Sequence, residues 1–248
     1  MSLGLGASLG KTGLTTPGIV TSGLVLKQNY DTGAVVPISD GAAFFDGTDD
    51  YIEFGDNANF DLGNSDFSIA AWINKTGNTS EVIFSKGALG VAGGYSFSCG
   101  DGSSQDLWLQ VESSGAYILA NSSTVLASGW NYVVAVCDKS ESDGLKLYIN
   151  GAEAAYTGTP GDPSGITIES GTGFNARIGT KHAGGVFFTG NICNVSIWSV
   201  VLTQAQIKSI MYKNYAGLNA SQITNLVSWW NLSADANDNH GSNNGTLS

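Results

Sequence analysis

The acidic side chains most able to do chemistry gather in the stretch FFDGTDDYIEFGD, which runs from residue 44 to residue 56. Calcium in proteins takes about six to eight oxygen ligands at flexible geometry, and Asp carboxylates and turn carbonyls are usual donors. The spacing is not that of an EF-hand loop, which needs acids at alternating positions and a terminal Glu. The stretch still offers several oxygen donors close together, namely Asp46, Gly47, Asp49 and Asp50.

The same stretch also fits a purely structural role. Asp46 to Asp49 is typical of a tight turn between two apolar runs, AAFF and YIEF, with Asp side chains accepting hydrogen bonds from turn amides. Glu53, between Ile52 and Phe54, would then point to water. The pattern favours this hairpin corner over a metal site, and both interpretations stay open.

A second group of residues could bind a sugar without changing it. Such a site needs an exposed aromatic ring beside amide or carboxylate groups on a sheet face. In the run DLWLQVE, alternation places Trp108, Gln110 and Glu112 on one face, and Tyr117 follows in the next run. Because most aromatic residues of a β-sandwich belong to its core, a structural role for Trp108 also stays open.

Residues suited to catalysis are scarce. The segment GASLG at residues 6–10 fits the pattern G-x-S-x-G, but it lacks the preceding strand and the following helix of a nucleophile elbow. His182 and His240 are the two histidines that could act as base in a Ser-His-Asp site, and both lie in loop-like segments. We therefore predict no catalytic residue and no enzyme activity.

The elements that position these side chains are predicted to be β-strands. The chain has 248 residues, of which 42% are hydrophobic, 12% are charged and 34 are glycine. About a dozen short runs rich in Val, Ile, Tyr, Phe and Trp are bounded by Gly, Asn, Asp and Ser. We expect an all-β fold of two packed antiparallel sheets, with a type I′ turn at Asn150-Gly151 and one short C-terminal helix from Thr203 to Met211.

Three segments are predicted along the chain. Residues 1–22 form a Gly-rich N-terminal arm, residues 23–214 form the sandwich, and residues 215–248 form a C-terminal strand with a polar tail. An unpaired apolar strand is an aggregation hazard, so the C-terminal strand must pair with a sheet. It either completes this sandwich or adds to the sheet of a neighbouring subunit.

Charge and cysteine content restrict the partners. A net charge of -11 argues against nucleic acid and against an anionic membrane surface, and no run reaches the roughly 20 apolar residues of a membrane span. The N-terminus lacks the features of a secretion signal, so we expect folding in a cytoplasm. Cys99, Cys137 and Cys193 are odd in number and form no CxxC pair, which predicts buried free thiols.

The order of motifs resembles a known family. The series AFFDGTDDYIEFGD, DFSIAAWIN, GWNYVVAVCD, LKLYINGAEAA and FTGNICNVSIWSVVLTQAQI is similar to the laminin-G-like, concanavalin A-like jelly roll. The match runs in order from about Gly41 to Ile210. The resemblance implies a jelly-roll sandwich in which Trp72, Trp130 and Tyr148 are framework residues.

The resemblance also bears on metal and on catalysis. Family members with a structural calcium combine a glycine carbonyl after this Asp with acids of the first and last strands. Here the last strand reads ICNV at residues 192–195, so both acids are replaced, and Asp31 or Asp40 would be the remaining donors. The hydrolases of this fold carry E-x-D-x-E or a close variant on one strand, and this sequence has no such triplet.

A laminin-G-like module without a secretion signal, with unpaired cysteines and a Gly-rich N-terminal arm, is similar to structural proteins of tailed bacteriophages. This resemblance implies a non-enzymatic virion structural or decoration protein on a capsid or tail. It would assemble in the host cytoplasm as a homo-oligomer, bind other virion proteins through the N-terminal arm and the C-terminal strand, and contact a host-surface glycan. The alternative is a carbohydrate-binding lectin or adhesion module unrelated to a virion, because this fold hosts many functions.

Overall fold

The structure is a computed structural model that describes residues 39, 41–63, 65–88, 93–100, 105–113, 116–168, 173–182 and 184–248. The chain divides into two units, residues 1–36 and residues 37–248, and every element below belongs to the second. The predicted N-terminal arm, together with Asp31 and Asp40, lies outside the described residues.

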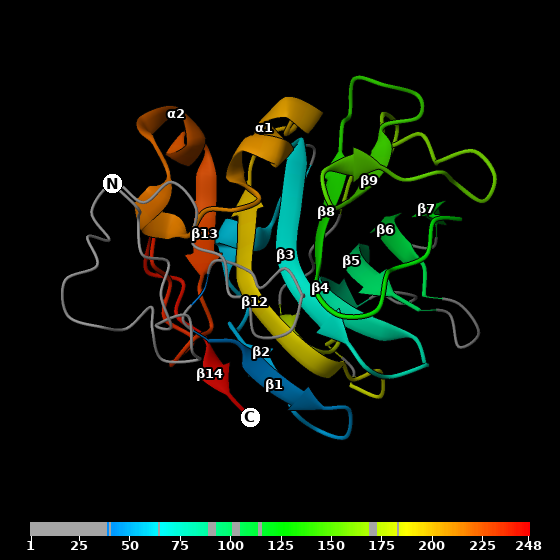
Figure 1. The fold of residues 1–248 in the computed structure, drawn as a ribbon. Coiled ribbons are helices and arrows are strands. Elements are labelled where there is room, and N and C mark those ends of the chain that lie inside the picture. Colours follow the sequence, from blue (N-terminus) through cyan, green and yellow to red (C-terminus); the bar gives the residue numbers. More distant parts are fainter. Residues whose placement is uncertain are drawn as a thin grey trace, which may run out of the picture. The chain divides into compact units, whose positions relative to one another are not determined.

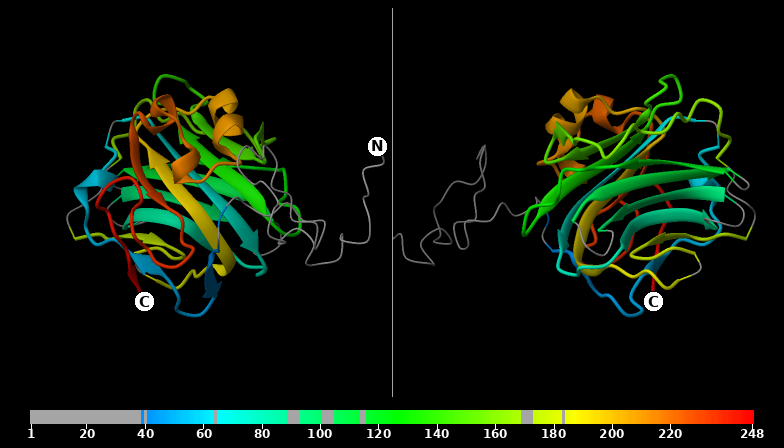
Figure 2. Two further views of the ribbon diagram at one scale, coloured as in Figure 1. Left: turned by 60° about the vertical axis from the view of Figure 1, so that its left-hand side comes forward. Right: turned by 90° about the vertical axis from the view of Figure 1, so that its right-hand side faces the viewer.

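Two antiparallel sheets of seven strands each form the described unit (Figures 1 and 2). Sheet A has the order β1 (Ala43–Asp46), β12 (Thr189–Trp198), β3 (Phe67–Lys75), β8 (Asn131–Cys137), β9 (Leu145–Ile149) and β10 (Ala152–Glu153), and β13 (Leu226–Trp230) also pairs with β12. Sheet B has the order β14 (Thr246–Leu247), β2 (Ile52–Glu53), β11 (Ala176–Ile178), β4 (Glu81–Ala88), β5 (Gly93–Cys99), β6 (Leu107–Ser113) and β7 (Ala116–Asn121). The predicted all-β, two-sheet jelly-roll sandwich is confirmed.

The main core lies between the two sheets. Alternation along β6 buries Leu107, Leu109 and Val111 completely, as the sequence predicts, and leaves Trp108 and Gln110 on the other face of the sheet. The two-residue turn between β9 and β10 is built by Asn150 and Gly151, whose φ angles of 52° and 79° fit the predicted type I′ geometry.

Short helices cover the outer face of sheet A. The helix α1 (Gln204–Ile210) begins at Thr203, which forms a capping box with Gln206, and the four-residue helix α2 (Ala220–Ile223) was not predicted. Two 3-10 turns also lie in the described part of the chain, η2 (Ala58–Phe60) and η3 (Tyr215–Gly217). Figure 1 shows α1 and α2 beside β3, β12 and β13. No helix of the described ranges has the length and apolar composition needed to cross a membrane.

A second hydrophobic cluster joins these helices to sheet A. Ile207 and Ile210 of α1 pack with aromatic residues of the sheet, and Trp72 Nε1 donates a hydrogen bond of 2.9 Å to the carbonyl oxygen of Met211. The shared cluster contains Trp72, Tyr132, Val134, Val136, Tyr148, Cys193, Trp198, Leu226 and Trp229. Sheet A is therefore apolar on both faces where it meets this cluster, and the helices cover that part of its outer face.

The C-terminal segment contributes one strand to each sheet. β13 pairs with β12 in sheet A, and β14 pairs with β2 in sheet B. Between them, Asp238 holds the chain by accepting hydrogen bonds from the backbone amides of Trp229 and Asn243. Of the two predicted alternatives, the structure shows the first, in which the strand completes its own sandwich.

The three cysteines are buried and unpaired, as predicted. Burial raises the pKa of both Cys137 and Cys193 to about 12, and it raises the pKa of Cys99 further. A thiol that stays protonated at neutral pH is a poor nucleophile and a poor metal ligand. These three residues therefore serve the core.

Candidate functional site

The acidic stretch is a turn, but it is not the predicted hairpin corner. β1 pairs with β12 in sheet A, whereas β2 pairs with β11 and β14 in sheet B, so the turn carries the chain from one sheet to the other. Asp50 Oδ2 accepts the amide of Asp46, and Asp46 Oδ1 accepts the amide of Thr48. Gly47 has a φ of 82°, and a Cβ there would lie 2.2 Å from Thr189 Oγ1. The hairpin prediction was wrong because it rested on adjacency in sequence.

The same turn gathers three carboxyl groups. One oxygen of each of Asp46, Asp49 and Asp50 lies within 4.8 Å of the others, at exposed or partly exposed positions. Three donors are about half of what calcium takes, and two of these carboxylates already accept turn amides. The chemistry fits a hard cation with water in the rest of its shell.

Cys193 and Asn194, which replace the acids of the family's last strand, lie away from the turn at Asp46. Asp46 is paired with Thr189, at the start of β12, while Cys193 and Asn194 follow further along that strand. At about 3.3 Å per residue, Asn194 is roughly 17 Å from Thr189. The replaced acids at residues 193 and 194 therefore say little about a cation at Asp46.

Glu53 lies on the outer face as predicted, with its side chain 29% exposed, but it is also paired with a basic residue. Its Oε2 accepts a hydrogen bond of 2.8 Å from Nε of Arg177, whose guanidinium carbon also lies 4.6 Å from the centre of the Tyr51 ring. Desolvation raises the Glu53 pKa, but hydrogen bonds from Asn175 and Arg177 and the charge of Arg177 outweigh it and lower the pKa below its usual value. This pair joins β2 to β11 at one end of sheet B.

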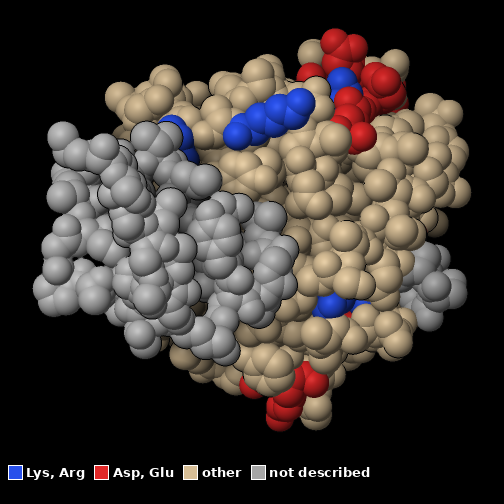
Figure 3. Space-filling view, viewed as in Figure 1, with Lys and Arg blue, Asp and Glu red and all other residues tan. Residues whose placement is uncertain are grey.

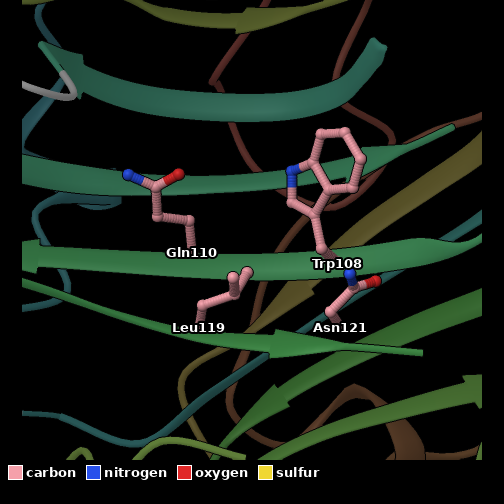
Figure 4. Close-up of a pocket in the computed structure, with 4 residues that line it drawn as sticks. All are labelled: Trp108, Gln110, Leu119 and Asn121. Carbon is pink, nitrogen blue, oxygen red and sulfur yellow. The ribbon is translucent and has the colours of Figure 1, made fainter. Parts of the chain in front are cut away.

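A shallow pocket lies at the other end of sheet B, on its outer face (Figure 4). It has a volume of about 260 Å³ and is lined by Trp108 and Gln110 from β6 and by Leu119 and Asn121 from β7. Figure 4 shows all four side chains on the same side of the two strands. In the register of the pair, Trp108 is opposite Asn121 and Gln110 is opposite Leu119.

The structure thus brings two predicted residues, Trp108 and Gln110, into one pocket and adds two that the sequence analysis missed. Alternation in the run AYILAN at residues 116–121 was the available signal, because it places Leu119 and Asn121 on one face. The other two candidates lie on the same face outside the pocket lining. Glu112 is 3% exposed and accepts a hydrogen bond of 3.2 Å from Gln110, and Tyr117 is 65% exposed on β7.

Small hydroxyl side chains continue this face toward the middle of sheet B. Ser98 is opposite Trp108 and Ser96 is opposite Gln110 in the register of β5 and β6, and their hydroxyl oxygens are 2.7 Å apart. Asn121 Oδ1 is buried and has no hydrogen-bond partner among the described residues. Ser96 and Ser98 are buried beneath this face, so the pocket offers a ligand an indole ring for apolar contact and two amides for uncharged hydrogen bonds.

Solved structures of other proteins share this fold. A Bacteroides ovatus protein provisionally assigned as a carbohydrate binding protein has a TM-score of 0.61 and 22% identity, over 86% of this chain and 58% of that one. Domain 4 of an extracellular GH43 arabinanase from Geobacillus stearothermophilus has a TM-score of 0.51 and 21% identity, over 72% of this chain and 82% of that one. The CBM40 of a Ruminococcus gnavus IT-sialidase has a TM-score of 0.50 and 13% identity, over 70% and 99%.

The sequence comparisons agree with this fold. A comparison with curated proteins finds no match. The family described as the Concanavalin A-like lectin/glucanases superfamily matches residues 46–208, which is more than half of the chain. The matched range begins at the inter-sheet turn and ends within α1, so it contains the pocket on β6 and β7. The chain therefore belongs to the Concanavalin A-like lectin/glucanases superfamily.

Proposed function

We propose that this chain is a carbohydrate-binding module that holds a glycan on the outer face of sheet B and does not cleave it. The observation that carries the proposal is the partly exposed Trp108, which has Gln110 two residues along β6 and Asn121 opposite it on β7, on a face that no described helix covers. A sugar presents an apolar ring face and a rim of hydroxyl groups, which suit an indole and amides respectively. The pocket is smaller than the roughly 300–1,000 Å³ of typical small-molecule sites, which fits a ligand held on one face.

The proteins of similar fold support a glycan as the ligand class. The arabinanase domain was solved in complex with arabinotriose, and the sialidase CBM40 was solved bound to α2,3-sialyllactose. Because identities this low speak for the fold alone, the pocket residues of this chain carry the proposal.

Replacing Trp108 by alanine is expected to weaken glycan binding by about 2 kcal/mol, or roughly 30-fold, because the ring supplies most of the apolar contact. A glycan array identifies the ligand, and titration calorimetry compares wild type with the variant. Phe44→Ala removes an aromatic side chain that is 65% exposed on β1 of sheet A, and it should leave binding unchanged. An array without any bound glycan would refute the proposal, as would equal affinities of wild type and Trp108→Ala.

The absence of cleavage is part of this proposal. Glycosidases of the common kinds use two carboxyl groups, about 5–10 Å apart, on either side of the scissile bond. On the outer face of β5, β6 and β7, the described residues include one acid, Glu112. Release of reducing sugar from the glycan that the array identifies, lost in Glu112→Gln, would contradict the proposal.

Calcium is a further prediction. If the carboxylates of the inter-sheet turn hold the ion with water completing its shell, added calcium raises the melting temperature and EDTA reverses the rise. Asp46 and Asp50 also cap the turn, so Asp49→Asn is the variant that spares the turn, and it should remove the rise. An unchanged melting temperature in calcium would show that these acids serve the turn alone.

The role as a virion structural protein stays a prediction, together with assembly in a host cytoplasm and a homo-oligomeric state. No observation on the described residues favours it over a glycan-binding module unrelated to a virion. The earlier alternative is therefore the function that we propose.

A further inference from the structure

One hydrogen bond beside the pocket decides which end of an amide faces the ligand. Gln110 Nε2 donates a hydrogen bond of 3.2 Å to Oε2 of Glu112, which lies two residues further along β6 on the same face of the sheet. A carboxylate only accepts hydrogen bonds, whereas an amide has an NH2 end that donates and a carbonyl end that accepts. The NH2 end of Gln110 is therefore the end that faces Glu112, and the carbonyl oxygen faces the other way.

Glu112 is placed so that it can hold the amide in this orientation. Its side chain is buried, and it has a further interaction partner within the chain, so its carboxyl group has little freedom to turn. Its backbone is paired on both sides, with Gly94 of β5 and Tyr117 of β7. Gln110 itself is only half-buried, and a side chain of that kind keeps much of its rotamer freedom unless a partner fixes it.

The carbonyl oxygen of Gln110 faces the indole nitrogen of Trp108. Figure 4 shows this oxygen turned toward Trp108 Nε1 and the amide nitrogen of Gln110 turned away from it. Among the described residues, neither Gln110 Oε1 nor Trp108 Nε1 has a hydrogen-bond partner, and neither atom is buried. A free acceptor beside a free donor fits one group that both donates and accepts, and a hydroxyl group has this property.

The indole nitrogens of the buried tryptophans are used inside the protein. Each donates a hydrogen bond to an oxygen of the chain, and the four residues are Trp72, Trp198, Trp229 and Trp230. The first three belong to the cluster under the α1 side, where most of the described surface is uncharged (Figure 3). Trp108 differs from these four because its donor is left for a molecule outside the chain.

A single hydroxyl group can reach both free atoms. Side chains two residues apart on a strand begin about 6.7 Å apart, and those of Trp108 and Gln110 point toward each other in Figure 4. A hydroxyl oxygen that bonds both atoms spans up to about 5.8 Å, at roughly 2.9 Å for each bond. Asn121 Oδ1, the other carbonyl oxygen of the lining, is buried, so Gln110 offers the more accessible acceptor.

We propose that the site recognises one sugar hydroxyl group between Gln110 Oε1 and Trp108 Nε1, and that Glu112 is the positioning residue that turns the Gln110 carbonyl toward it. The inference rests on the proposed function and names the group of the glycan that is recognised. The ring face of Trp108 takes the apolar side of the sugar, while a hydroxyl at the sugar's rim donates to Gln110 and accepts from the indole. A glycan in which this hydroxyl is substituted leaves the Gln110 carbonyl without a donor.

The test uses analogues of a glycan that the array identifies, in which each hydroxyl group is replaced in turn by fluorine. Fluorine is close to a hydroxyl group in size but cannot donate a hydrogen bond. For the wild type, the analogue at one position is expected to bind roughly tenfold more weakly than the parent glycan, by titration calorimetry. In Gln110→Leu, which changes a half-buried side chain at the pocket, the parent and that analogue should bind within about twofold of each other.

Two variants of Glu112 separate its hydrogen bond from its charge. Glu112→Leu removes the acceptor, so the Gln110 amide can turn either end toward the ligand, and the ratio of parent to analogue affinity should fall several-fold. Glu112→Gln also removes the charge but keeps an oxygen that can accept from Gln110, so it should restore most of that ratio. A purely structural role of Glu112 would weaken the parent and the analogue equally, and an unchanged ratio in Glu112→Leu therefore overturns its positioning role.

The free wild-type protein keeps this test decisive if Glu112→Leu does not fold. The Nε2 group of Gln110 should be nearly as ordered as the backbone by NMR relaxation, and an order parameter below about 0.6 overturns the role of Glu112. A glycan that binds without any fluorine-sensitive position, or whose sensitivity persists in Gln110→Leu, overturns the hydroxyl contact and leaves the proposed function standing. An array without any bound glycan overturns the proposed function and this inference with it.

Discussion

Replacing Trp230 by alanine is expected to lower the free energy of unfolding by about 3–5 kcal/mol, the range for a large aromatic residue removed from a core. Trp230 lies on β13 and is completely buried between the sheets. Its ring centre is 4.5 Å from that of Phe54, 5.8 Å from that of Phe60 and 6.2 Å from that of Phe84. Its Nε1 donates a hydrogen bond of 2.8 Å to the carbonyl oxygen of Asn243, which alanine would leave unpaired.

Urea unfolding followed by far-UV circular dichroism measures this loss. Tyr117→Ala is the matched control, because it removes an aromatic side chain that is 65% exposed, and it should cost less than about 0.5 kcal/mol. A loss below about 1 kcal/mol in Trp230→Ala would mean that the C-terminal strand is not seated in this sandwich. The neighbouring-subunit alternative would then return.

A second large effect is expected at Lys86. Its side chain is completely buried, with Nζ 2.7 Å from Asp56 Oδ1 and 3.3 Å from Asp61 Oδ1. The side chains of both acids are about a third exposed, at 32% and 36%. Nζ also donates to the carbonyl oxygen of Phe174, so one cation ties β4 to two loops. The buried partner, and not the acids, is the one that water cannot reach.

Removing the two sides of this network should therefore have unequal effects. The double variant Asp56→Asn, Asp61→Asn leaves Lys86 as a buried charge without an acid, and we expect it to lose about 3–5 kcal/mol of stability. Lys86→Met fills the same space with an apolar chain and leaves acids that can turn to water, so it should lose clearly less. Urea unfolding of both variants at neutral pH decides the order. A larger loss of stability in Lys86→Met than in the double variant would show that the acids, and not the lysine, need the ion pair to be tolerated in the fold.

The same ion-pair network predicts how the free energy of unfolding changes at low pH. The hydrogen bond from the Gly173 amide, and then the one from Lys86, hold the pKa of Asp56 below its usual value of 3.8. A carboxyl group with a lowered pKa in the folded state adds stability above its unfolded pKa and loses it as the pH falls through the folded value. The wild type should lose this part of its stability below about pH 4, and Lys86→Met should show a shallower loss.

The fold was accessible from sequence where the signal is local. Alternation along β6 and the Asn150-Gly151 turn depend on a few neighbouring residues, and both were predicted correctly. The turn after Asp46 was misread because the partner of β1 is β12, far along the chain, and no local pattern reports that pairing. The pairing of Glu53 with Arg177 was missed for the same reason.

The pocket shows the same division. Trp108 and Gln110 share one strand, so alternation alone places them together on the outer face. Asn121 joins them through the register of β6 with β7, which the sequence leaves undefined until the turn between the strands is known. The described helices cover the outer face of sheet A and leave that of sheet B exposed, because the apolar residues of α1 pack against sheet A.

The place of β13 and β14 in the two sheets sets the order in which this chain can fold as it leaves the ribosome. The hairpins from β4 to β7 and from β8 to β10 join neighbouring strands and can form as soon as they emerge. β1 has to wait for β12, and the centre of the core has to wait for Trp230. Until β13 is synthesised, the aromatic rings that Trp230 covers stay exposed to water. We therefore expect the nascent chain to depend most on chaperones just before β13 leaves the ribosome.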